Sequence, residues 1–425
     1  MKNSAANKLR QVPEGYLIVG IDPHQKKHAA VAMTKDFTIR CKFKFNNSRE
    51  GYNLALERIR EEMIKAGSKG VMFAIETGGH YWRNLAYFLD ERGFPFRFIN
   101  QYTLKRRREG KDLNRRKNDY RDSEVAAQLL CTGEFTESKL KQGVYAELHA
   151  AHNSYRRMVK ERTRITNLIK GLLDGLFPEF PRIFKDACCL NALSVLVVCP
   201  IPGVISSMTE EEFINTIRAN HRGLLKKKKL RSLYHVAGIS VGIEVGAKAV
   251  SLEIGFLVEK LRLIKRQLQI LEEILIKLVD KTEEGKYLLS IRGLNYIGVA
   301  GLLAELGCFR LYRSAKQMIK MAGSNPTEKE SGGKRGLRTP MSKHGRPALR
   351  HCAWTSVVPM LRFNTDFRAW AKQRRERPAH ANPLCGKEIL GAALNRLLRL
   401  AFALAKNRTY YQVSRPELAL AAVSK

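Results

Sequence analysis

The hydrophobic pattern of the first 135 residues alternates between strands and helices. Apolar or alternating runs of strand length occupy residues 16–22, 28–33, 38–45, 71–75 and 94–99. Helical spacing occupies residues 51–65 and 81–91, and a third helix begins at Asp119 and ends near Cys131. We therefore predict a mixed α/β domain over residues 16–135, preceded by a polar leader over residues 1–15. Residues 105–117 are strongly basic and are predicted to form a loop.

Beyond residue 140 the pattern is helical. Residues 144–176 have helical spacing and end before Pro178, and residues 182–250 are predicted to be mostly helical. A regular series of three- and four-residue steps then follows, formed by Ile254, Leu257, Leu261, Ile264, Leu268, Leu271, Leu275 and Leu278. This is the a/d pattern of a coiled coil, so we predict a coiled coil at about residues 252–280 within a helical linker region, residues 140–284. Self-association through it is the favoured interpretation, and a long helix packed within its own chain is the alternative.

The C-terminal part is predicted to be mainly α-helical. LLSIRGLNYIGVAGLLAEL (residues 288–306) resembles a helix–hairpin–helix, whose Gly-containing turn presents backbone N–H groups to a phosphate. Gly293 supplies that turn, and Asn295 stands where a second glycine is usual. Because Asn tolerates the left-handed conformation, we expect the turn to form. A plain helical hairpin is the alternative. The predicted domain covers residues 285–375, and a helical extension covers residues 376–425.

The net charge of the chain indicates the class of its binding partner. The chain has 76 Lys and Arg against 40 Asp and Glu, a net charge of +36, which attracts polyanions such as nucleic acids. The eight cysteines show no zinc-ligand spacing and are predicted to be reduced thiols. The N-terminus lacks the apolar region of a secretory signal, and no uncharged apolar run reaches the roughly 20 residues of a membrane span. We expect a cytoplasmic, nucleoid-associated protein without a membrane partner.

Four carboxylates lie at strand ends or on one helix face in the first domain. Its strands and helices follow the order of an RNase H-like (RuvC-like) domain, and Asp22 and Glu76 each end a buried strand. Asp119 and Asp122 are three apart, so a helix places both on one face. Converging carboxylates repel one another unless cations lie between them, and two Mg²⁺ ions would satisfy such a site. Turn and helix-cap roles are the alternative for each acid.

Four sequence blocks resemble a known family. GIDPHQKKHAAVA (20–32), IETGGHYW (75–82) and NDYRDSEVAAQLL (118–130) are similar to the acidic blocks of the insertion-sequence-110 family of DEDD transposases. AGSNPTEKESGGKRGLRTPMSKHGRPALR (322–350) is similar to its second conserved block. The resemblance covers residues 16–135 and 285–375. Asn118 and Ser324 depart from the pattern, because a hydroxyl residue often precedes the first Asp and an apolar residue usually follows Gly323.

The resemblance implies a mechanism. Asp22, Glu76, Asp119 and Asp122 carry over as Mg²⁺ ligands, and Ser331 carries over as a nucleophile that joins covalently to a DNA phosphate. The family has a coiled coil between its two domains. Family members are thought to form dimers or tetramers with composite active sites, guided by a structured (bridge) RNA that the element encodes.

The surroundings of Ser331 suit this role, and an ordinary turn residue in a flexible basic loop is the alternative. Gly332 and Gly333 let a phosphate approach closely, and nearby Lys and Arg side chains can neutralise its charge. A Ser hydroxyl needs a base or a metal, so we expect the acidic site of the same or a neighbouring subunit to activate Ser331; His344 is a candidate base by sequence proximity alone. His24 and His28 follow Asp22; polar turn residues are the favoured interpretation, and contact with phosphate or metal is the alternative.

The predicted function is that of a transposase or site-specific recombinase acting on donor and target DNA. The predicted nucleic-acid contacts are Arg106, Arg107, Arg108, Arg115, Arg116, Lys117, Lys226, Lys227, Lys228, Lys229, Gly293, Lys334, Arg335, Arg338, Lys343, Arg346 and Arg350. For the basic clusters, a solvated surface is the alternative. Two other functions stay open: a RuvC-like Holliday-junction resolvase in which water attacks, and a basic DNA-binding scaffold without catalysis.

Overall fold

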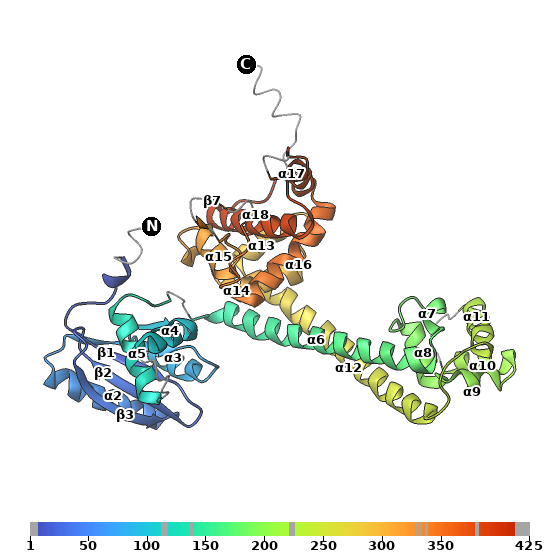
Figure 1. The fold of residues 1–425 in the computed structure, drawn as a ribbon, viewed down its shortest axis with the longest axis horizontal. Coiled ribbons are helices and arrows are strands. Elements are labelled where there is room, and N and C mark those ends of the chain that lie inside the picture. Colours follow the sequence, from blue (N-terminus) through green and yellow to red (C-terminus); the bar gives the residue numbers. More distant parts are fainter. Residues whose placement is uncertain are drawn as a thin grey trace, which may run out of the picture. The chain divides into compact units, whose positions relative to one another are not determined.

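The fold is given by a computed structural model of the chain (Figure 1). It describes residues 7–111, 118–136, 140–220, 226–327, 330–331, 334–335, 339–378 and 382–412. The chain forms two compact units that meet in sequence between Leu140 and Lys141, and each unit is described by itself.

The first unit contains a five-stranded mixed sheet. Its strands are β1 (Tyr16–Asp22), β2 (Lys27–Met33), β3 (Ile39–Asn46), β4 (Gly70–Glu76) and β5 (Phe96–Ile99), in the order β3-β2-β1-β4-β5. The β1–β2 and β2–β3 pairs are antiparallel, and the β1–β4 and β4–β5 pairs are parallel. The predicted α/β class and all five predicted strands are confirmed, with ends that differ by one or two residues.

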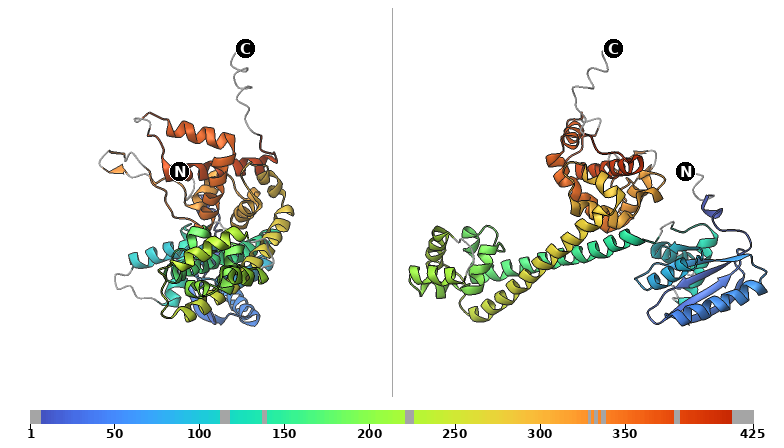
Figure 2. Two further views of the ribbon diagram at one scale, coloured as in Figure 1. Left: turned by 90° about the vertical axis from the view of Figure 1, so that its right-hand side faces the viewer. Right: turned by 180° about the vertical axis from the view of Figure 1, so that it is seen from behind.

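Helices cover both faces of this sheet (Figures 1 and 2). Successive residues of a strand point to opposite faces, so Leu17 and Val19 pack in one core while Ile18 packs in the other. The first core includes α2 (Arg49–Lys65) and α3 (Trp82–Glu91), and the second includes α4 (Gln101–Lys111) and α5 (Asp119–Cys131).

The prediction of a loop over residues 105–117 is wrong for the part that the structure describes. Helix α4 runs to Lys111, and Asn100 begins it by accepting a hydrogen bond from the Tyr102 N–H at 2.8 Å. Leu104 anchors the helix in the core, where it is 2% exposed. Lys and Arg are good helix formers, so a basic composition does not oppose a helix once one apolar side is buried.

The second unit is helical and has two hydrophobic cores. One core is formed by the C-terminal part of α6 (Gly143–Leu176), the N-terminal part of α12 (Ala247–Asp280) and the short helices that lie between them in sequence. These short helices are α7 (Phe180–Ile183), α8 (Leu190–Val198), α9 (Pro202–Ser206), α10 (Glu210–Ala219) and α11 (Lys227–Gly238). The prediction that this region is mostly helical is confirmed.

The other core unites the opposite ends of α6 and α12 with the C-terminal helices. These are α13 (Glu283–Leu289), α14 (Tyr296–Leu306), the 3-10 helix η1 (Phe309–Leu311), α15 (Ala315–Ala322), α16 (Pro347–Phe363), α17 (Thr365–Arg375) and α18 (Gly386–Asn407). Between α15 and α16, β6 (Glu330–Ser331) pairs with β7 (Lys334–Arg335) in a small antiparallel hairpin.

The predicted coiled-coil helix exists, and its seam is used within the chain. α12 lies along α6 over much of its length (Figures 1 and 2). Ile254, Leu261, Ile264, Leu268 and Leu275 of the predicted seam are buried. Val258 and Val279 are also buried, so the apolar stripe is wider than an a/d seam and suits an intramolecular bundle. The alternative of a helix packed in its own chain therefore describes these residues.

The hairpin between α13 and α14 differs from the expected turn at Asn295. Gly293 has a φ of 92°, and a Cβ there would lie 2.9 Å from the Met360 Cα, so only glycine fits this approach to α16. Asn295 is extended, with φ −102° and ψ 172°, and its Oδ1 accepts from the Gly298 N–H at 2.9 Å. The expected left-handed Asn is therefore wrong, because a helix N-cap satisfies an otherwise unpaired N–H.

None of the described helices combines the length and the apolar content that crossing a membrane requires.

Candidate functional site

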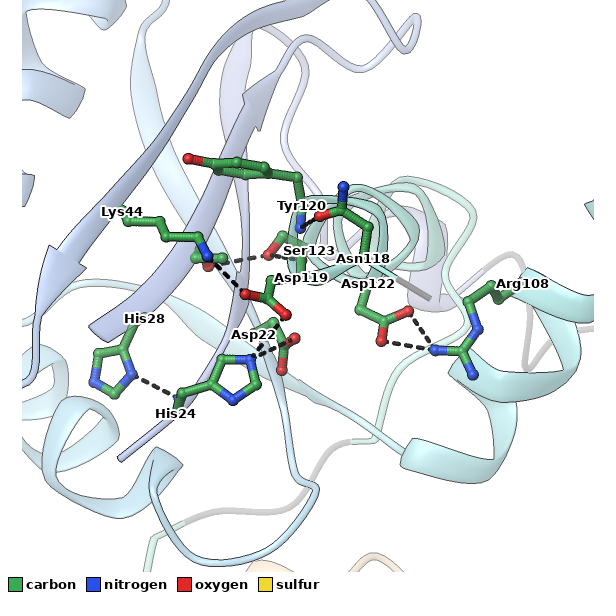
Figure 3. Close-up of polar contacts among 11 residues, drawn as sticks. Asp22, His24, His28, Lys44, Arg108, Asn118, Asp119, Tyr120, Asp122 and Ser123 are labelled. Carbon is green, nitrogen blue, oxygen red and sulfur yellow. Dashed lines mark hydrogen bonds and ion pairs between the residues drawn. The ribbon is translucent and has the colours of Figure 1, made fainter. Parts of the chain in front are cut away.

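The candidate site lies at the end of β1, where α5 crosses the sheet. Asp22 ends β1 and is 5% exposed, and Asp119 is the first residue of α5. His24 lies between them: its Nε2 is 3.1 Å from the Asp22 Oδ2 and 3.5 Å from the Asp119 Oδ1 (Figure 3). One ligand atom from each of the three side chains lies within 4.8 Å of the others. The structure thus brings together two of the four predicted carboxylates and adds a histidine.

A close backbone contact sets this arrangement. A Cβ at Gly20 would lie 1.9 Å from the Ser123 carbonyl oxygen, so β1 and α5 approach as only a glycine permits. The Ser123 hydroxyl donates to the carbonyl oxygens of Ala29 at 3.0 Å and Asp119 at 2.9 Å. The start of α5 is therefore fixed against β1 and β2.

A lysine faces the exposed side of the site. The Lys44 Nζ, on β3, lies 2.7 Å from the Asp119 Oδ2 (Figure 3). This hydrogen bond is the main reason that the pKa of Asp119 lies below its ordinary value and that the pKa of Lys44 lies above it. Asp119 is therefore held in its ionised form.

Glu76 ends the strand next to Asp22. β4 runs parallel to β1 with Ile75 opposite Ile21, so both acids leave the sheet at the same edge. Glu76 is 8% exposed. A Cβ at Gly78 would lie 2.8 Å from the Glu76 Oε1, so this glycine leaves room beside the carboxylate. The contact of Gly78 with Glu76 was not predicted, because it forms only once the loop folds back.

Asp122 forms a different contact. The Arg108 Nη1, on α4, lies 2.6 Å from one carboxylate oxygen of Asp122 and 2.7 Å from the other (Figure 3). Asp122 is 3% exposed, so this is a largely desolvated charge pair. Arg108 was predicted to contact nucleic acid, whereas the structure pairs it with a predicted metal ligand.

The two histidines after Asp22 are more than turn residues. His28 is fully buried, lies within β2, and accepts a hydrogen bond from the His24 backbone N–H at 3.0 Å through its Nδ1. Burial lowers the pKa of His28 to about 4, so its ring is neutral and can accept that bond. His28 thus holds the loop that carries His24. The interpretation as a polar turn residue is wrong for His28, because its burial could not be read from its spacing, whereas His24 does lie in the loop between β1 and β2.

Ser331 and its neighbours are described only in part. The backbone of Ser331 lies in β6, paired with Lys334 of β7. Arg115, Arg116, Lys117, Gly332, Gly333 and Arg338 lie outside the described residues. The base of this hairpin is held by a bridge between Pro326 and Met341 and by the Ser342 hydroxyl, which lies 2.8 Å from the Asn325 Oδ1.

Several predicted nucleic-acid contacts also serve the fold. Arg346 and Arg350 donate to the carbonyl oxygens of Glu305 and Ala322, each at 2.8 Å. Arg106 lies over the Tyr102 ring, and Arg107 lies 3.7 Å from Glu134. Lys226–Lys229 stand at the start of α11, where the side chains of Lys226, Lys227 and Lys228 are exposed to solvent.

The donor set suits a hard divalent cation. Carboxylate oxygens are the preferred ligands of Mg²⁺, and an imidazole nitrogen is also accepted by Mn²⁺. Buried carboxylates at one sheet edge, together with the convergence of Asp22, His24 and Asp119, fit such an ion. The surroundings include two cationic side chains: Lys44 pairs with Asp119, and Arg108 pairs with Asp122.

Two family models match the chain. Residues 19–178 match one described as transposase, for DEDD transposases of the IS110 type, and residues 285–372 match one described as transposase, IS116/IS110/IS902 family. The chain belongs to the IS110 family of transposases. The family resemblance is confirmed, and an IS110-family transposase is an enzyme of DNA transposition that cuts DNA. No curated protein matches the chain.

Proposed function

We propose that this IS110-family transposase cuts and rejoins DNA strands with divalent metal, Mg²⁺ in the cell, held by Asp22, Glu76, Asp119 and Asp122. The convergence of Asp22, His24 and Asp119 at one sheet edge carries the proposal. We also infer that the first unit is RNase H-like, because the strand order β3-β2-β1-β4-β5 with one antiparallel and one parallel side supports that topology.

The ligand roles follow from where each carboxylate stands. Asp22 and Asp119 already share one neighbour, the His24 imidazole, and Glu76 leaves the same sheet edge. Asp122 joins them by exchanging its Arg108 partner. When bound, two divalent ions supply Lewis-acid stabilisation of phosphate charge and lower the pKa of an attacking hydroxyl.

The other side chains of the site position the carboxylates or neutralise their charge. Lys44 keeps Asp119 ionised and can bind a phosphate oxygen when the carboxylate turns toward a cation. His24 is held by His28 at its backbone, so its ring stays over the two aspartates. Arg108 stabilises buried Asp122 until a cation replaces it.

Ser331 supplies the attacking oxygen in this proposal. Its Oγ forms a bond to phosphorus while the bond from phosphorus to one DNA oxygen breaks, and the departing hydroxyl gains the proton. A DNA hydroxyl later attacks the phosphoserine and restores the serine. Family resemblance supports this role, as do the basic residues Lys343, Arg346 and Arg350 close by in sequence.

We further propose a guide (bridge) RNA and a homo-oligomer as partners, beside donor and target DNA. The charge of +36 suits both nucleic acids, and family resemblance supports the guide.

Two variants of the full chain test the function. With matched DNA ends, copurified RNA and Mg²⁺, the wild-type chain is expected to give a protein–DNA adduct that survives denaturation. Asp22→Asn should give neither cleavage nor adduct. Ser331→Ala should give no adduct and no strand exchange.

The results separate the alternatives. Cleavage that persists in Ser331→Ala would identify a resolvase-like enzyme in which water attacks. Recombination that persists in Asp22→Asn would show that the acids serve only as caps and turns. Glu61→Gln, an exposed change on α2, is the control and should behave as wild type.

A further inference from the structure

The last two described helices carry a concentration of positive charge. Between residues 362 and 408 there are 11 Lys and Arg against three Asp and Glu. α17 contacts α18, and its Phe367 and Ala371 side chains are buried, at 1% and 4% exposed. Most of this segment lies beyond residue 372, where the second family match ends.

Two arginines lie against the ring of one tryptophan on these helices. The Arg374 guanidinium lies 5.7 Å from the Trp370 ring centre, and that of Arg396, on α18, lies 5.3 Å from the same ring. Arg396 also lies 5.2 Å from the Phe367 ring. Stacking on rings fixes the guanidinium groups without using their outward N–H donors.

The cluster of Arg374, Arg377 and Arg396 has no counter-ion among the described residues. No described carboxylate forms an ion pair with Arg374, Arg377 or Arg396, and the Arg374 Nε is buried without a hydrogen-bond partner in the described part of the chain. Burial, together with the charges of Arg377 and Arg396, lowers the pKa of Arg374. Crowded like charges cost free energy that an external anion can offset.

An exposed stripe continues the positive surface along α17. Arg368, Lys372 and Arg375 are exposed and follow the i, i+4, i+7 spacing of one helix side. At about 1.5 Å per residue, the stripe spans about 10 Å, close to three nucleotide steps of roughly 3.4 Å. A solvated surface would not need guanidinium groups fixed on rings.

We propose that α17 and α18 form a binding site for the phosphodiester backbone of a nucleic acid. Arg374, Arg377 and Arg396 hold one phosphate, and the α17 stripe contacts the phosphates that follow. The contacts are to charge and not to bases, so binding is independent of sequence. This inference rests on the nucleic-acid function proposed above and adds to it a contact surface outside the acidic site.

The salt dependence of nucleic-acid binding tests the proposed site on α17 and α18. The full-length Arg374→Gln/Arg377→Gln variant is compared with wild type by fluorescence anisotropy in EDTA. The probes are a duplex DNA, the same sequence as a single strand, and a hairpin RNA. Losing the one phosphate contact that these arginines share should reduce the slope of log K against log salt by about 0.9 on the duplex or about 0.7 on single strands. The probe with the largest change identifies the nucleic acid that occupies the site.

Two controls isolate the site from net charge and from folding. Arg49→Gln/Arg60→Gln removes two exposed charges from α2 and should keep the wild-type slope. Arg374→Lys/Arg377→Lys keeps the charge and should retain most of the wild-type slope. The glutamine variant should melt at or above the wild-type temperature, because like-charge repulsion is relieved.

A wild-type slope for the glutamine variant on all three probes would overturn the inference, and so would equal losses in the α2 control. EDTA prevents metal-dependent cleavage, so this outcome is separate from a failure of the catalytic proposal: if Asp22→Asn still abolishes cleavage, the function stands without this site. Absence of wild-type binding to every probe would reject both.

Discussion

Gly20 is the residue on which the geometry of the acidic site depends. It stands two residues before Asp22 on β1, directly beneath the Ser123 carbonyl of α5. The close approach of strand and helix sets the separation between Asp22 and Asp119. A side chain at this position must therefore move the two acids apart.

Gly20→Ala is expected to destabilise the first unit by about 3 kcal/mol, because the new methyl group overlaps backbone that cannot give way. Urea unfolding of the full chain measures this as a lower midpoint. Gly171→Ala, on α6, is the matched control. Because a Cβ there would meet no neighbouring atom within 4 Å, the free energy of unfolding should stay equal or rise by up to about 1 kcal/mol. An unchanged midpoint in Gly20→Ala would show that the site tolerates a wider spacing.

His152 gives the second unit a pH dependence. It is 4% exposed on α6, and burial, followed by the charge of Arg156, lowers its pKa to about 4. Below the unfolded-state pKa of about 6.5, the unfolded chain takes up a proton that the folded chain refuses. Stability is therefore full above about pH 6.5 and falls as the pH drops toward 4, by up to about 3 kcal/mol for this group.

His152→Gln removes that proton uptake, so its unfolding free energy should fall less than that of wild type between pH 6.5 and 4. Exposed His235→Gln should keep the wild-type slope. Buried His28 contributes in the same range, so part of the slope remains in either variant. Parallel curves for wild type and His152→Gln would contradict this account of His152.

At the scale of elements, α12 has two apolar sides, and the described residues bury one of them and leave the other exposed. Its buried side packs along α6, while an outer stripe is 41–61% exposed and consists of Leu252, Phe256, Leu263, Ile270 and Ile274. The four- and seven-residue steps keep this stripe on one side of the helix. If the predicted oligomer uses α12, a second copy must contact this outer stripe.

Phe256→Ser/Leu263→Ser/Ile270→Ser is expected to lower the mass of the oligomer in light scattering and to leave the melting temperature unchanged, since these side chains are already exposed. The control Leu54→Ser/Ile64→Ser/Leu190→Ser removes equally exposed apolar groups elsewhere and should keep the wild-type mass. An unchanged mass in the α12 variant would place the self-association surface on another element.

Local sequence patterns predicted the helices and strands well, but they did not predict which of these elements pack together. A short apolar run that ends in an acid is visible in the sequence, so Asp22 and Glu76 could be found at strand ends. The seam of α12 was equally visible, but its partner, α6, lies about 100 residues away in the sequence. The two departures from the family pattern also became clear only in three dimensions. Asn118 caps α5 as a hydroxyl residue would, and the buried Ser324 hydroxyl bonds to Asn395.

At the scale of the whole molecule, charge and motif order indicated a nucleic-acid enzyme, and the family matches agree. What the sequence could not give was the pairing of charges. Lys44 with Asp119 and Arg108 with Asp122 join elements that are separated by loops whose paths depend on tertiary packing. The same limit hid the role of His24, which lies near Asp22 in sequence but contacts Asp119 only in the folded unit.

Divalent-metal binding to the full chain tests the central claim most directly. Titration calorimetry with Mn²⁺, in the absence of nucleic acid, is expected to detect binding by wild type and by Glu61→Gln. In Asp22→Asn the affinity should fall by about tenfold or more, because a charged ligand is lost from the centre of the cluster. Asp22→Asn binding as tightly as wild type would contradict the assignment of this sheet edge as the metal site.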